Sequence, residues 1–329
     1  MRAVVITEFG EPDVLKIREV PTPVPVRGEV RVKVKATGVN RADLSQRMGK
    51  YPPPPDCPQD ILGLEFAGVI DAIGDGAGDL KVGDRVFGLV GGGSYAEYVV
   101  VHNRTLTKIP DHLNFVDAAA IPEVFMTAYD AMVTQAGLVA GDTVLISAVG
   151  SGVGTAALQI VNALGGRAIG TSRTAEKLDG AKQHGLHEGI LVKDGKFADE
   201  VLKLTDGKGV DIVLERVGGA YVEEDILCMV PKGRLMMVGL VAGAKANLDL
   251  GRLLANRLDI RGTTMRKRPL EEKIDAANIF SKQVIPLIIK GDLKPIVAET
   301  FPLKEAAEAH RHVQADKNFG KVVLIVDAE

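Results

Sequence analysis

The pattern of hydrophobic and polar residues changes about a third of the way along the chain. From Met1 to about His102, short runs rich in β-branched residues alternate with turns that contain Gly, Pro and Asp. This close spacing is typical of an antiparallel, barrel-like sheet. A run of prolines at 52–55 favours a stiff extended loop inside this region. The first part of the chain is therefore predicted to be mostly sheet.

The middle of the chain, from about Asp117 to Met265, has a different rhythm. An apolar run at 118–135 predicts one long helix, and strand-like runs then alternate with segments of helical spacing. Strands that alternate with helices predict βαβ units and a doubly wound parallel sheet with helices on both faces. After Arg266 come a helical pattern and a strand at 321–326, and the pattern leaves their place in the fold open.

A glycine-rich turn stands out in this middle part. The strand-like run Thr143–Ser147 is followed by Gly-rich residues and then by apolar residues at helical spacing. At such a turn the backbone N–H groups of Gly152, Val153 and Gly154, together with the helix dipole, can bind a pyrophosphate, and Ser151 precedes them in the same motif as a further cofactor-binding candidate. A dinucleotide is the expected ligand, although the spacing is not the G-x-G-x-x-G fingerprint. The alternative is that the glycines only allow close packing of the helix on the strand.

The next strand indicates which dinucleotide binds. It ends in Thr171, Ser172 and Arg173, where binders of NADH usually carry an acidic residue for the ribose hydroxyls. A carboxylate would repel a 2′-phosphate, whereas Ser172 can donate a hydrogen bond and Arg173 and Lys177 supply positive charge. The sequence therefore favours NADPH over NADH. The alternative is an ordinary surface turn with basic residues.

Composition excludes several classes of protein. The chain has 329 residues, about two domains by the usual length prior, with 46% hydrophobic and 25% charged residues. A net charge of −3 and an aromatic content of 4% argue against nucleic-acid and membrane-surface binding. The basic run 266–268 is interpreted as a solvated loop. Two distant cysteines, Cys57 and Cys228, and the lack of a long apolar or signal-like segment favour the cytoplasm.

Several spaced blocks, in order, give the chain a resemblance to a known family. The blocks include GVNRADLSQRMGKYPPPP, ILGLEFAGVIDAIG, GDRVFGLVGGGSYAEYVVV, AAAIPEVFMTAYDAM, SGVGTAA and NFGKVVL. The chain resembles the zinc-independent quinone oxidoreductase (zeta-crystallin-like) branch of the medium-chain dehydrogenase/reductase superfamily. The resemblance covers essentially the whole length.

The resemblance implies an α/β fold in which a Rossmann doubly wound parallel sheet is joined to a GroES-like β-barrel catalytic domain. The implied division is a GroES-like catalytic domain at 1–124, a Rossmann NADPH-binding domain at 125–265, and a C-terminal segment at 266–329 that returns to the catalytic domain. It also implies NADPH as the cofactor and a quinone as the acceptor.

The residues at the family's metal positions differ from those of zinc-dependent relatives. Those relatives have a Cys near the position of Asn40 and a His at the position of Leu64, and leucine cannot ligate a metal. The loop that would carry a structural zinc has no cysteine here. We therefore expect no metal. Without a Lewis acid, reduction of a quinone or enone is the easier direction of reaction.

The resemblance also assigns roles to individual residues, each with a simpler alternative. Asn40 is expected near the nicotinamide and substrate, or as a helix cap. Tyr51 is expected to line the substrate site, or to be a plain loop aromatic. Thr127 is expected beside the nicotinamide ribose or ring, or packed within its helix.

Further cofactor contacts are implied near the end of the sheet and the end of the chain. Val238, Gly239 and Leu240 are expected beside the nicotinamide carboxamide. Asn318 and Lys321 match a C-terminal cofactor contact, although Lys321 is alternatively a solvated strand residue. A tyrosine common in this branch after the third Rossmann strand is replaced by Val192 and Lys193, which predicts looser adenine binding.

Other functions stay open on the sequence. An NADPH-dependent enone or enoyl-thioester reductase needs the same cofactor site and a longer apolar channel. A non-enzymatic NADPH-binding structural or RNA-associated protein is a third hypothesis. We expect a homodimer, because the last Rossmann strand near 258–264 is predicted to be an exposed edge.

Overall fold

The structure is a computed structural model that describes residues 1–326. The chain folds into two compact units. Unit 1 contains residues 1–126, 265–289 and those from 295 onward, and unit 2 contains residues 127–264 and 290–294. The first boundary falls inside helix α3 (Pro122–Tyr129), between Met126 and Thr127. Within the described residues, no helix is both long enough and apolar enough to cross a membrane.

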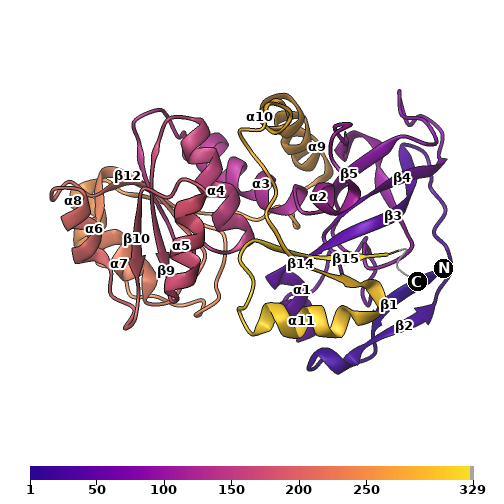
Figure 1. Cartoon of the computed structure of the whole chain (residues 1–329), viewed down its shortest axis with the longest axis horizontal. Helices are drawn as coiled ribbons and strands as arrows, with labels where there is room; N and C mark the ends of the chain where they lie inside the picture. The colour runs from indigo at the N-terminus through magenta and orange to yellow at the C-terminus, as the bar shows by residue number, and fades with distance from the viewer. Residues whose placement is uncertain (327–329) are drawn as a thin grey trace. The chain divides into compact units, whose positions relative to one another are not determined.

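Unit 1 is built on a seven-stranded sheet with a separate two-stranded sheet (Figure 1). In β3, alternate valines are fully buried while the residues between them are partly exposed, which is the period of two expected for a strand with one face on the core. In spatial order the large sheet contains β14 (Val297–Pro302), β15 (Lys321–Ile325), β3 (Glu29–Val39), β4 (Glu65–Ile73), β5 (Arg85–Leu89) and β7 (Leu106–Lys108), with β6 (Tyr98–His102) also paired to β3. The small sheet contains β1 (Arg2–Ile6) and β2 (Leu15–Glu19).

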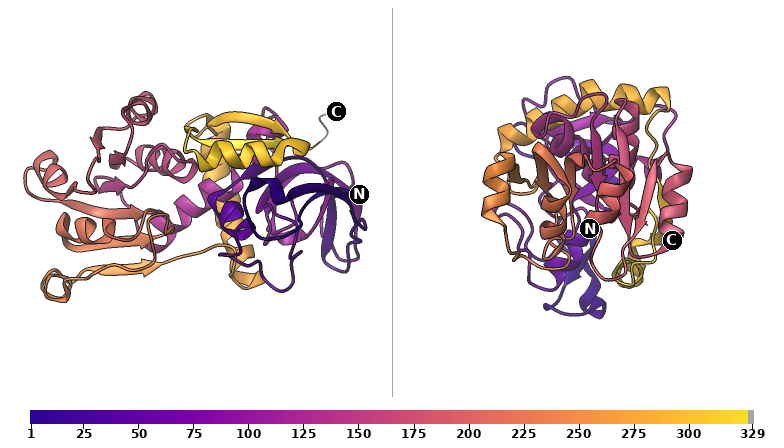
Figure 2. Two further views of the ribbon diagram at one scale, coloured as in Figure 1. Left: turned by 90° about the horizontal axis from the view of Figure 1, so that it is seen from below. Right: turned by 90° about the vertical axis from the view of Figure 1, so that its left-hand side faces the viewer.

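The C-terminal residues complete this sheet. Strand β15 pairs antiparallel with β3, and β14 pairs parallel with β15. Helix α11 lies along these two strands in both Figure 1 and the left view of Figure 2. The helices of this unit are α1 (Arg41–Arg47), α2 (Phe115–Ala119), α9 (Leu270–Ile279), α10 (Ile285–Lys290), which ends at the unit boundary, and α11 (Ala306–Gln314).

Unit 2 is a six-stranded parallel sheet in the order β10-β9-β8-β11-β12-β13. Helices α4 and α5 cover one face and α6, α7 and α8 the other, as Figure 1 and the right view of Figure 2 show. The strands are β8 (Thr143–Ile146), β9 (Arg167–Ser172), β10 (Glu188–Leu191), β11 (Val210–Glu215), β12 (Met229–Met237) and β13 (Asp259–Gly262). The helices are α4 (Gly152–Ala163), α5 (Ala175–Gln183), α6 (Ala198–Leu204), α7 (Tyr221–Leu227) and α8 (Leu250–Asn256).

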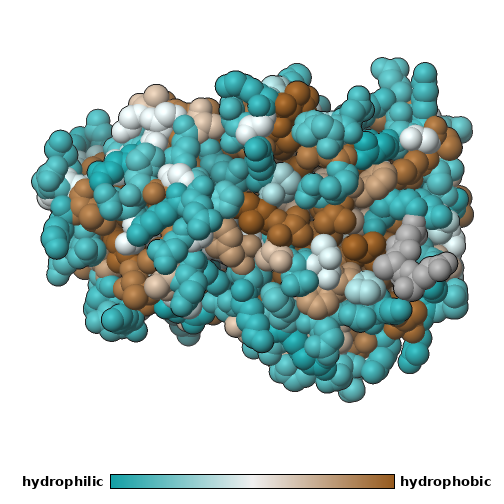
Figure 3. Space-filling model, viewed as in Figure 1, coloured by the Kyte–Doolittle hydropathy of each residue, from teal (hydrophilic) through white to brown (hydrophobic). Residues whose placement is uncertain are grey.

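This strand order is that of a Rossmann fold, and it confirms the predicted fold class. The order reverses between β8 and β11, which is the point where such sheets bind dinucleotides at the carboxyl ends of the strands. The predicted antiparallel, barrel-like first part corresponds to the sheet of unit 1. The face drawn in Figure 3 is predominantly hydrophilic with separate hydrophobic patches, as the composition leads one to expect.

The single helix predicted at 118–135 is wrong in detail. Helix α2 ends at Ala119, α3 begins at Pro122, and a wider π-helical stretch follows at Asp130–Gln135. Proline has no N–H and clashes with the preceding turn, so it begins a new helix where the apolar pattern continues unbroken.

Candidate active site

A buried lysine joins three strands of unit 1. The Lys321 ammonium donates to Glu65 Oε1 at 2.6 Å, to Asn40 Oδ1 at 2.6 Å and to the Val39 carbonyl at 3.1 Å. Asn40 Nδ2 also donates to Glu65 Oε1, at 2.9 Å. The side chains of Lys321 and Glu65 are 4% and 0% exposed, so their charges compensate each other away from water. We call Asn40, Glu65 and Lys321 the lysine cluster.

Strand register brings this cluster together. Val322 of β15 pairs with Val39 of β3, which sets Lys321 beside Asn40, and Glu65 begins the neighbouring strand β4. Gly38 makes the close approach possible, because a Cβ there would lie 2.1 Å from Glu65 Oε1. One alternative from the sequence is thereby decided. Lys321 does not merely solvate its strand, because its ammonium is buried.

Asn40 occupies the N-cap position of helix α1 and forms a capping box with Asp43, as its alternative role predicted, and its amide group also takes part in the lysine cluster. Its backbone N–H donates to Asp43 Oδ2 at 2.8 Å, while the amide group contacts Lys321 and Glu65. Both ends of the amide are therefore held, and its orientation is fixed. The second Nδ2 hydrogen is directed to the Gly38 carbonyl at the long distance of 3.5 Å, so a ligand oxygen that came closer would compete for it.

A directed chain of hydrogen bonds continues from Asp43 into the core of unit 1. Arg47 can only donate, so His310 Nδ1, 3.2 Å from it, accepts, and the ring proton lies on Nε2, which faces Tyr95 Oη at 3.2 Å. Tyr95 in turn donates to Asp43 Oδ2 at 3.4 Å. Burial, with the Arg47 charge, lowers the pKa of His310 to about 3, so this histidine is neutral. Burial raises the pKa of Asp43 to about 6.

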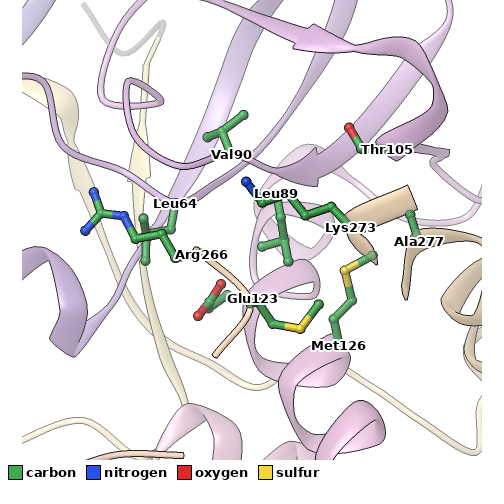
Figure 4. Close-up of a pocket in the computed structure, with 10 residues that line it drawn as sticks. Leu64, Leu89, Val90, Thr105, Glu123, Met126, Arg266, Lys273 and Ala277 are labelled. Carbon is green, nitrogen blue, oxygen red and sulfur yellow. The ribbon is translucent and has the colours of Figure 1, made fainter. Parts of the chain in front are cut away.

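Glu123, at the start of α3, is attached to the lysine cluster from the other side. Its backbone N–H donates to Glu65 Oε2 at 2.8 Å. Its own carboxyl points into a cavity of unit 1, as Figure 4 shows. Burial, followed by the nearby Glu65 charge, raises the pKa of Glu123 to about 8. The cavity is lined by Leu64, Leu89, Val90, Thr105, Glu123, Met126, Met265, Arg266, Lys273 and Ala277.

Arg266 also lines this cavity, and the interpretation of 266–268 as a solvated loop is wrong for it. Arg266 is 6% exposed, and its guanidinium donates to the Gly91 carbonyl at 2.7 Å, to the Tyr51 carbonyl at 3.2 Å and to Gln46. It lies 5.0 Å from the Tyr51 ring centroid, so the predicted site residue Tyr51 is half-buried against a cation. Residues 266–268 are all basic, so the sequence does not show that Arg266 is the buried one, and only the packing of the folded chain does.

In unit 2, Thr127 carries a hydroxyl that the rest of the described chain leaves without a hydrogen-bond partner, although it is buried. A buried polar atom of this kind is costly unless a ligand or water satisfies it. The orphaned hydroxyl therefore fits the predicted role of Thr127 in contacting a coenzyme.

The glycine-rich turn lies at the switch point, between the end of β8 and the start of α4. Ser151 precedes the helix and its Oγ accepts from the Gly154 N–H at 3.1 Å. A Cβ on Gly154 would lie 2.5 Å from the Val149 carbonyl oxygen, so the turn requires glycine there. The helix has 12 residues and presents its first N–H groups beyond Ser151. This backbone cradle fits a pyrophosphate.

Arg216 is a residue that sequence reasoning missed, and it contacts this turn from a neighbouring strand. It follows β11, and its guanidinium donates to Ser151 Oγ and, at 3.4 Å, to the Ala148 carbonyl. Its backbone N–H donates to Ser147 Oγ at 2.8 Å. A positive charge thus lies at the turn that is expected to hold a pyrophosphate. The adjacency of β8 and β11, which no local pattern reveals, places it there.

The other predicted cofactor residues are distributed over both units. Lys177 packs on the turn, since a Cβ on Gly150 would lie 2.8 Å from its Cβ. Ser172 is buried at the end of β9, and Arg173 beyond it is exposed. Val238, Gly239 and Leu240 follow β12, where the Val238 N–H donates to the Glu215 carbonyl at 2.8 Å. Asn318 belongs to unit 1 and donates to the Gly320 carbonyl at 2.7 Å.

Comparison with known proteins agrees with this geometry. Residues 26–111 match the family model of the alcohol dehydrogenase GroES-like domain, and residues 152–281 match that of zinc-binding dehydrogenases. The chain is 35% identical to the quinone oxidoreductase of Homo sapiens over 331 aligned positions, 99% of this chain and 98% of the relative.

Solved structures give the same picture. A mycobacterial protein in complex with NADPH superimposes with a TM-score of 0.89 at 30% identity, over 99% of this chain and 100% of that one. An enzyme described as an NAD-dependent alcohol dehydrogenase gives a TM-score of 0.87 at 34% identity, over 99% and 100% of the two chains. The chain belongs to the quinone oxidoreductase family of medium-chain dehydrogenases/reductases.

Proposed function

We propose that this protein is an NADPH-dependent quinone reductase that works without a metal. The observation that carries the proposal is the glycine turn at the switch point, where Gly154 leaves no room for a side chain and Arg216 adds positive charge. Relatives over nearly the full length are named quinone oxidoreductases, which supports the choice of acceptor.

The coenzyme is assigned by the end of β9. No acidic residue is present at 171–173, while Arg173 and Lys177 supply positive charge near Ser172. Because one structural relative is described with NAD and another with NADPH, these three residues decide the preference for NADPH. The residues that would hold the coenzyme are Ser151, Gly152, Val153, Gly154, Ser172, Arg173, Lys177, Val238, Gly239, Leu240 and Asn318. The resemblance also places Lys321 among them, but its three ammonium hydrogens are used by Val39, Asn40 and Glu65, so it would act by positioning Asn40.

When bound, the reduced coenzyme supplies a hydride for the acceptor. The chain's own part is to orient the acceptor and to donate hydrogen bonds to the oxygen on which negative charge develops. The Asn40 amide, fixed by Lys321 and Glu65, is one such donor. The Tyr51 phenol is assigned to the acceptor, and the Thr127 hydroxyl to the coenzyme.

Metal-free chemistry is part of the proposal, although one matching family model carries the description of zinc-binding dehydrogenases. Leu64 cannot ligate a metal, and the Asn40 amide is already engaged. Within residues 1–326, no group of three or more His, Cys, Asp or Glu side chains is arranged to hold an ion. Elemental analysis of the purified protein tests this, and stoichiometric zinc together with loss of activity on its removal would contradict it.

The activity test is oxidation of NADPH in the presence of three acceptors. We expect turnover with 9,10-phenanthrenequinone, weaker turnover with a simple enone, and little with crotonyl-CoA. A reversed order, with the thioester fastest, would favour an enoyl-thioester reductase. Failure of all three would overturn the proposed function.

A homodimer in the cytoplasm completes the proposal. Strand β13 is the last strand of its sheet, and unpaired edges are commonly covered by a partner. Nearby, Leu250 and Leu254 of α8 are 67% and 80% exposed, which supports a partner on this side of unit 2. Analytical ultracentrifugation at micromolar concentration tests the association, and a monomer would contradict it.

A further inference from the structure

Arg266 is a buried cation that joins three separate segments of unit 1. Its guanidinium donates to the Gly91 carbonyl at 2.7 Å, to the Tyr51 carbonyl at 3.2 Å and to the side-chain oxygen of Gln46. Gln46 is itself 1% exposed, so this contact lies inside the unit. The three acceptors belong to the loop after β5, the loop around the proline run 52–55 and helix α1. An arginine suits this position, because its planar group holds several donors in a fixed geometry.

The same guanidinium also packs against the ring of Tyr51. Its central carbon lies 5.0 Å from the ring centroid, within the range of a cation–π contact. The Lys267 ammonium lies 5.6 Å from the same centroid, but Lys267 is exposed and its charge is screened by solvent. Arg266 therefore holds Tyr51 at two points, the backbone carbonyl and the ring.

The hydrogen bonds of Arg266 satisfy its donors without cancelling its charge. All three acceptors are neutral oxygens, whereas the buried ammonium of Lys321 is paired with the Glu65 carboxylate at 2.6 Å. Burial lowers the pKa of Arg266, but a guanidinium stays protonated in proteins. Figure 4 shows this group turned away from the Glu123 carboxyl. A positive charge thus lies beside the Tyr51 ring with neutral groups as its hydrogen-bond partners.

We propose that Arg266 is a positioning residue for reduction of the acceptor and that it acts through Tyr51. It fixes the loop and the ring of Tyr51, and its charge draws electron density from the ring. The phenol O–H thereby becomes a stronger hydrogen-bond donor to the acceptor's carbonyl oxygen, where negative charge develops as the hydride arrives. The inference rests on the proposed function, because it is there that the Tyr51 phenol is assigned to the acceptor.

Helix α1 links Arg266 to the second residue assigned to the acceptor. Asn40 caps the start of this helix, and Gln46, which accepts a hydrogen bond from Arg266, lies near its end. One guanidinium therefore ties the helix that carries Asn40 to the loop that carries Tyr51. The glycine-rich turn proposed for NADPH belongs to unit 2 instead. Loss of Arg266 should therefore impair use of the acceptor and leave the affinity for NADPH unchanged.

The first test needs no turnover. The chain has 5 tyrosines, so protein labelled with ¹³C at the tyrosine carbon that bears the hydroxyl should give one resonance for each, and Tyr51→Phe identifies that of Tyr51. Arg266→Gln should shift the Tyr51 resonance, because the cation beside the ring is lost. The exposed Arg18→Gln is the control and should not shift it. An unchanged Tyr51 resonance in Arg266→Gln would overturn the inference, whatever the activity.

The second test is a double-mutant cycle in the reduction of 9,10-phenanthrenequinone at saturating NADPH. Tyr51→Phe, which keeps the ring and loses the hydroxyl, and Arg266→Gln should each lower kcat/KM about tenfold, as loss of one hydrogen bond in the transition state does. Because Arg266 acts through the phenol, the double variant should lose less than about twofold more than Tyr51→Phe alone. Independent effects would multiply to about a hundredfold, and that result would overturn the inference.

A conservative variant separates charge from hydrogen bonding and serves if Arg266→Gln does not fold. Arg266→Lys keeps the charge but lacks the planar group that reaches three acceptors, so its kcat/KM should lie between those of wild type and Arg266→Gln. Activity of Arg266→Lys as low as that of Arg266→Gln would overturn the part assigned to the charge. The affinity for NADPH, measured by calorimetry, should stay within about twofold in both variants, and a larger loss in both would contradict a role confined to the acceptor.

Wild type itself distinguishes this inference from the proposed function. If wild type reduces the quinone and Arg266→Gln matches it in kcat/KM, the inference fails while the proposed function stands. If wild type reduces no quinone, the proposed function itself fails.

Discussion

The two units prepare their ligand sites in different ways. In unit 1, the lysine cluster is a set of buried charges and hydrogen bonds, with Lys321 and Glu65 almost fully enclosed. In unit 2, the glycine-rich turn at 147–154 is proposed to bind the coenzyme, and we call it the coenzyme turn. It is made of backbone geometry, with Gly154 tightly packed, and the nearby cation Arg173 is exposed. A buried network fixes its side chains, but loss of one partner leaves a buried charge unpaired and lowers the free energy of unfolding. A backbone cradle depends instead on the absence of side chains at its glycines. Substitutions should therefore affect unit 1 mainly through stability and unit 2 mainly through affinity.

The largest expected effect is in the lysine cluster. Lys321→Met leaves the Glu65 carboxylate buried without its cation, and we expect a loss of about 3–5 kcal/mol in the free energy of unfolding. Urea denaturation measures this loss. The exposed Lys317→Met is the matched control and should change stability little. Adding Glu65→Gln should recover part of the loss, and a single-variant loss below about 1 kcal/mol would show that the charge is not enclosed in solution.

The coenzyme turn should respond in affinity instead. Gly154→Ala places a Cβ 2.5 Å from the Val149 carbonyl oxygen, so the turn must open. Overpacking of about 1–3 kcal/mol predicts NADPH binding weaker by about ten- to a hundredfold by calorimetry. Gly262→Ala, at a position with nothing within 4 Å of the added Cβ, is the control. Unchanged affinity in Gly154→Ala would remove the pyrophosphate from this turn.

Two cations of unit 2 should differ in what they recognise. Arg216→Gln removes charge at the turn and should weaken NADPH and NADH alike, by about tenfold, because both carry the pyrophosphate. Arg173→Ala with Lys177→Ala should weaken NADPH about tenfold and NADH hardly at all, because only NADPH carries the 2′-phosphate. Dissociation constants for both coenzymes test the pair. Equal losses in the Arg173 and Lys177 variant would reject its assignment.

The smallest expected effect is a difference between the two units in how their stability depends on pH. In unit 2, burial and the Glu215 charge raise the pKa of Asp225 well above its ordinary value. An acid whose folded-state pKa is raised stabilises the fold while protonated, and that stability is lost as pH rises from the unfolded pKa through the folded one. Glu215 accepts the Val217 and Gly218 N–H groups, so the proton resides on Asp225.

Asp225→Asn should therefore flatten the decline in unfolding free energy that begins as the pH rises above about 4, the ordinary pKa of an aspartate in the unfolded chain, measured by urea denaturation at each pH. His310 of unit 1 behaves in the opposite sense, because its pKa is lowered to about 3 and its stability is lost as pH falls below about 6.5. Parallel pH dependence of wild type and Asp225→Asn would contradict the assignment of the proton.

The parts of the site that could be predicted from sequence are those with local signals. The strand, glycine turn and helix at 143–164 are contiguous, so the turn follows from periodicity and glycine placement alone, and the anion site proposed there depends on this local geometry. The end of β9 is likewise a short segment, and the sequence itself shows that it contains no acidic residue. Asn40, Tyr51 and Lys321 were found only through resemblance, since nothing local distinguishes them from caps, loop aromatics and surface lysines.

The sequence by itself determined the fold class and the coenzyme turn, because hydrophobic period and backbone freedom act over a few residues. The tertiary structure alone decided which charged groups are buried and what they face. Lys321 and Asn40 meet across 281 positions, Arg266 is enclosed while its neighbour is not, and Glu123 is turned into a cavity. The physical reason is that ionisation and charge pairing depend on distance and solvent, which strand pairing sets and residue order does not.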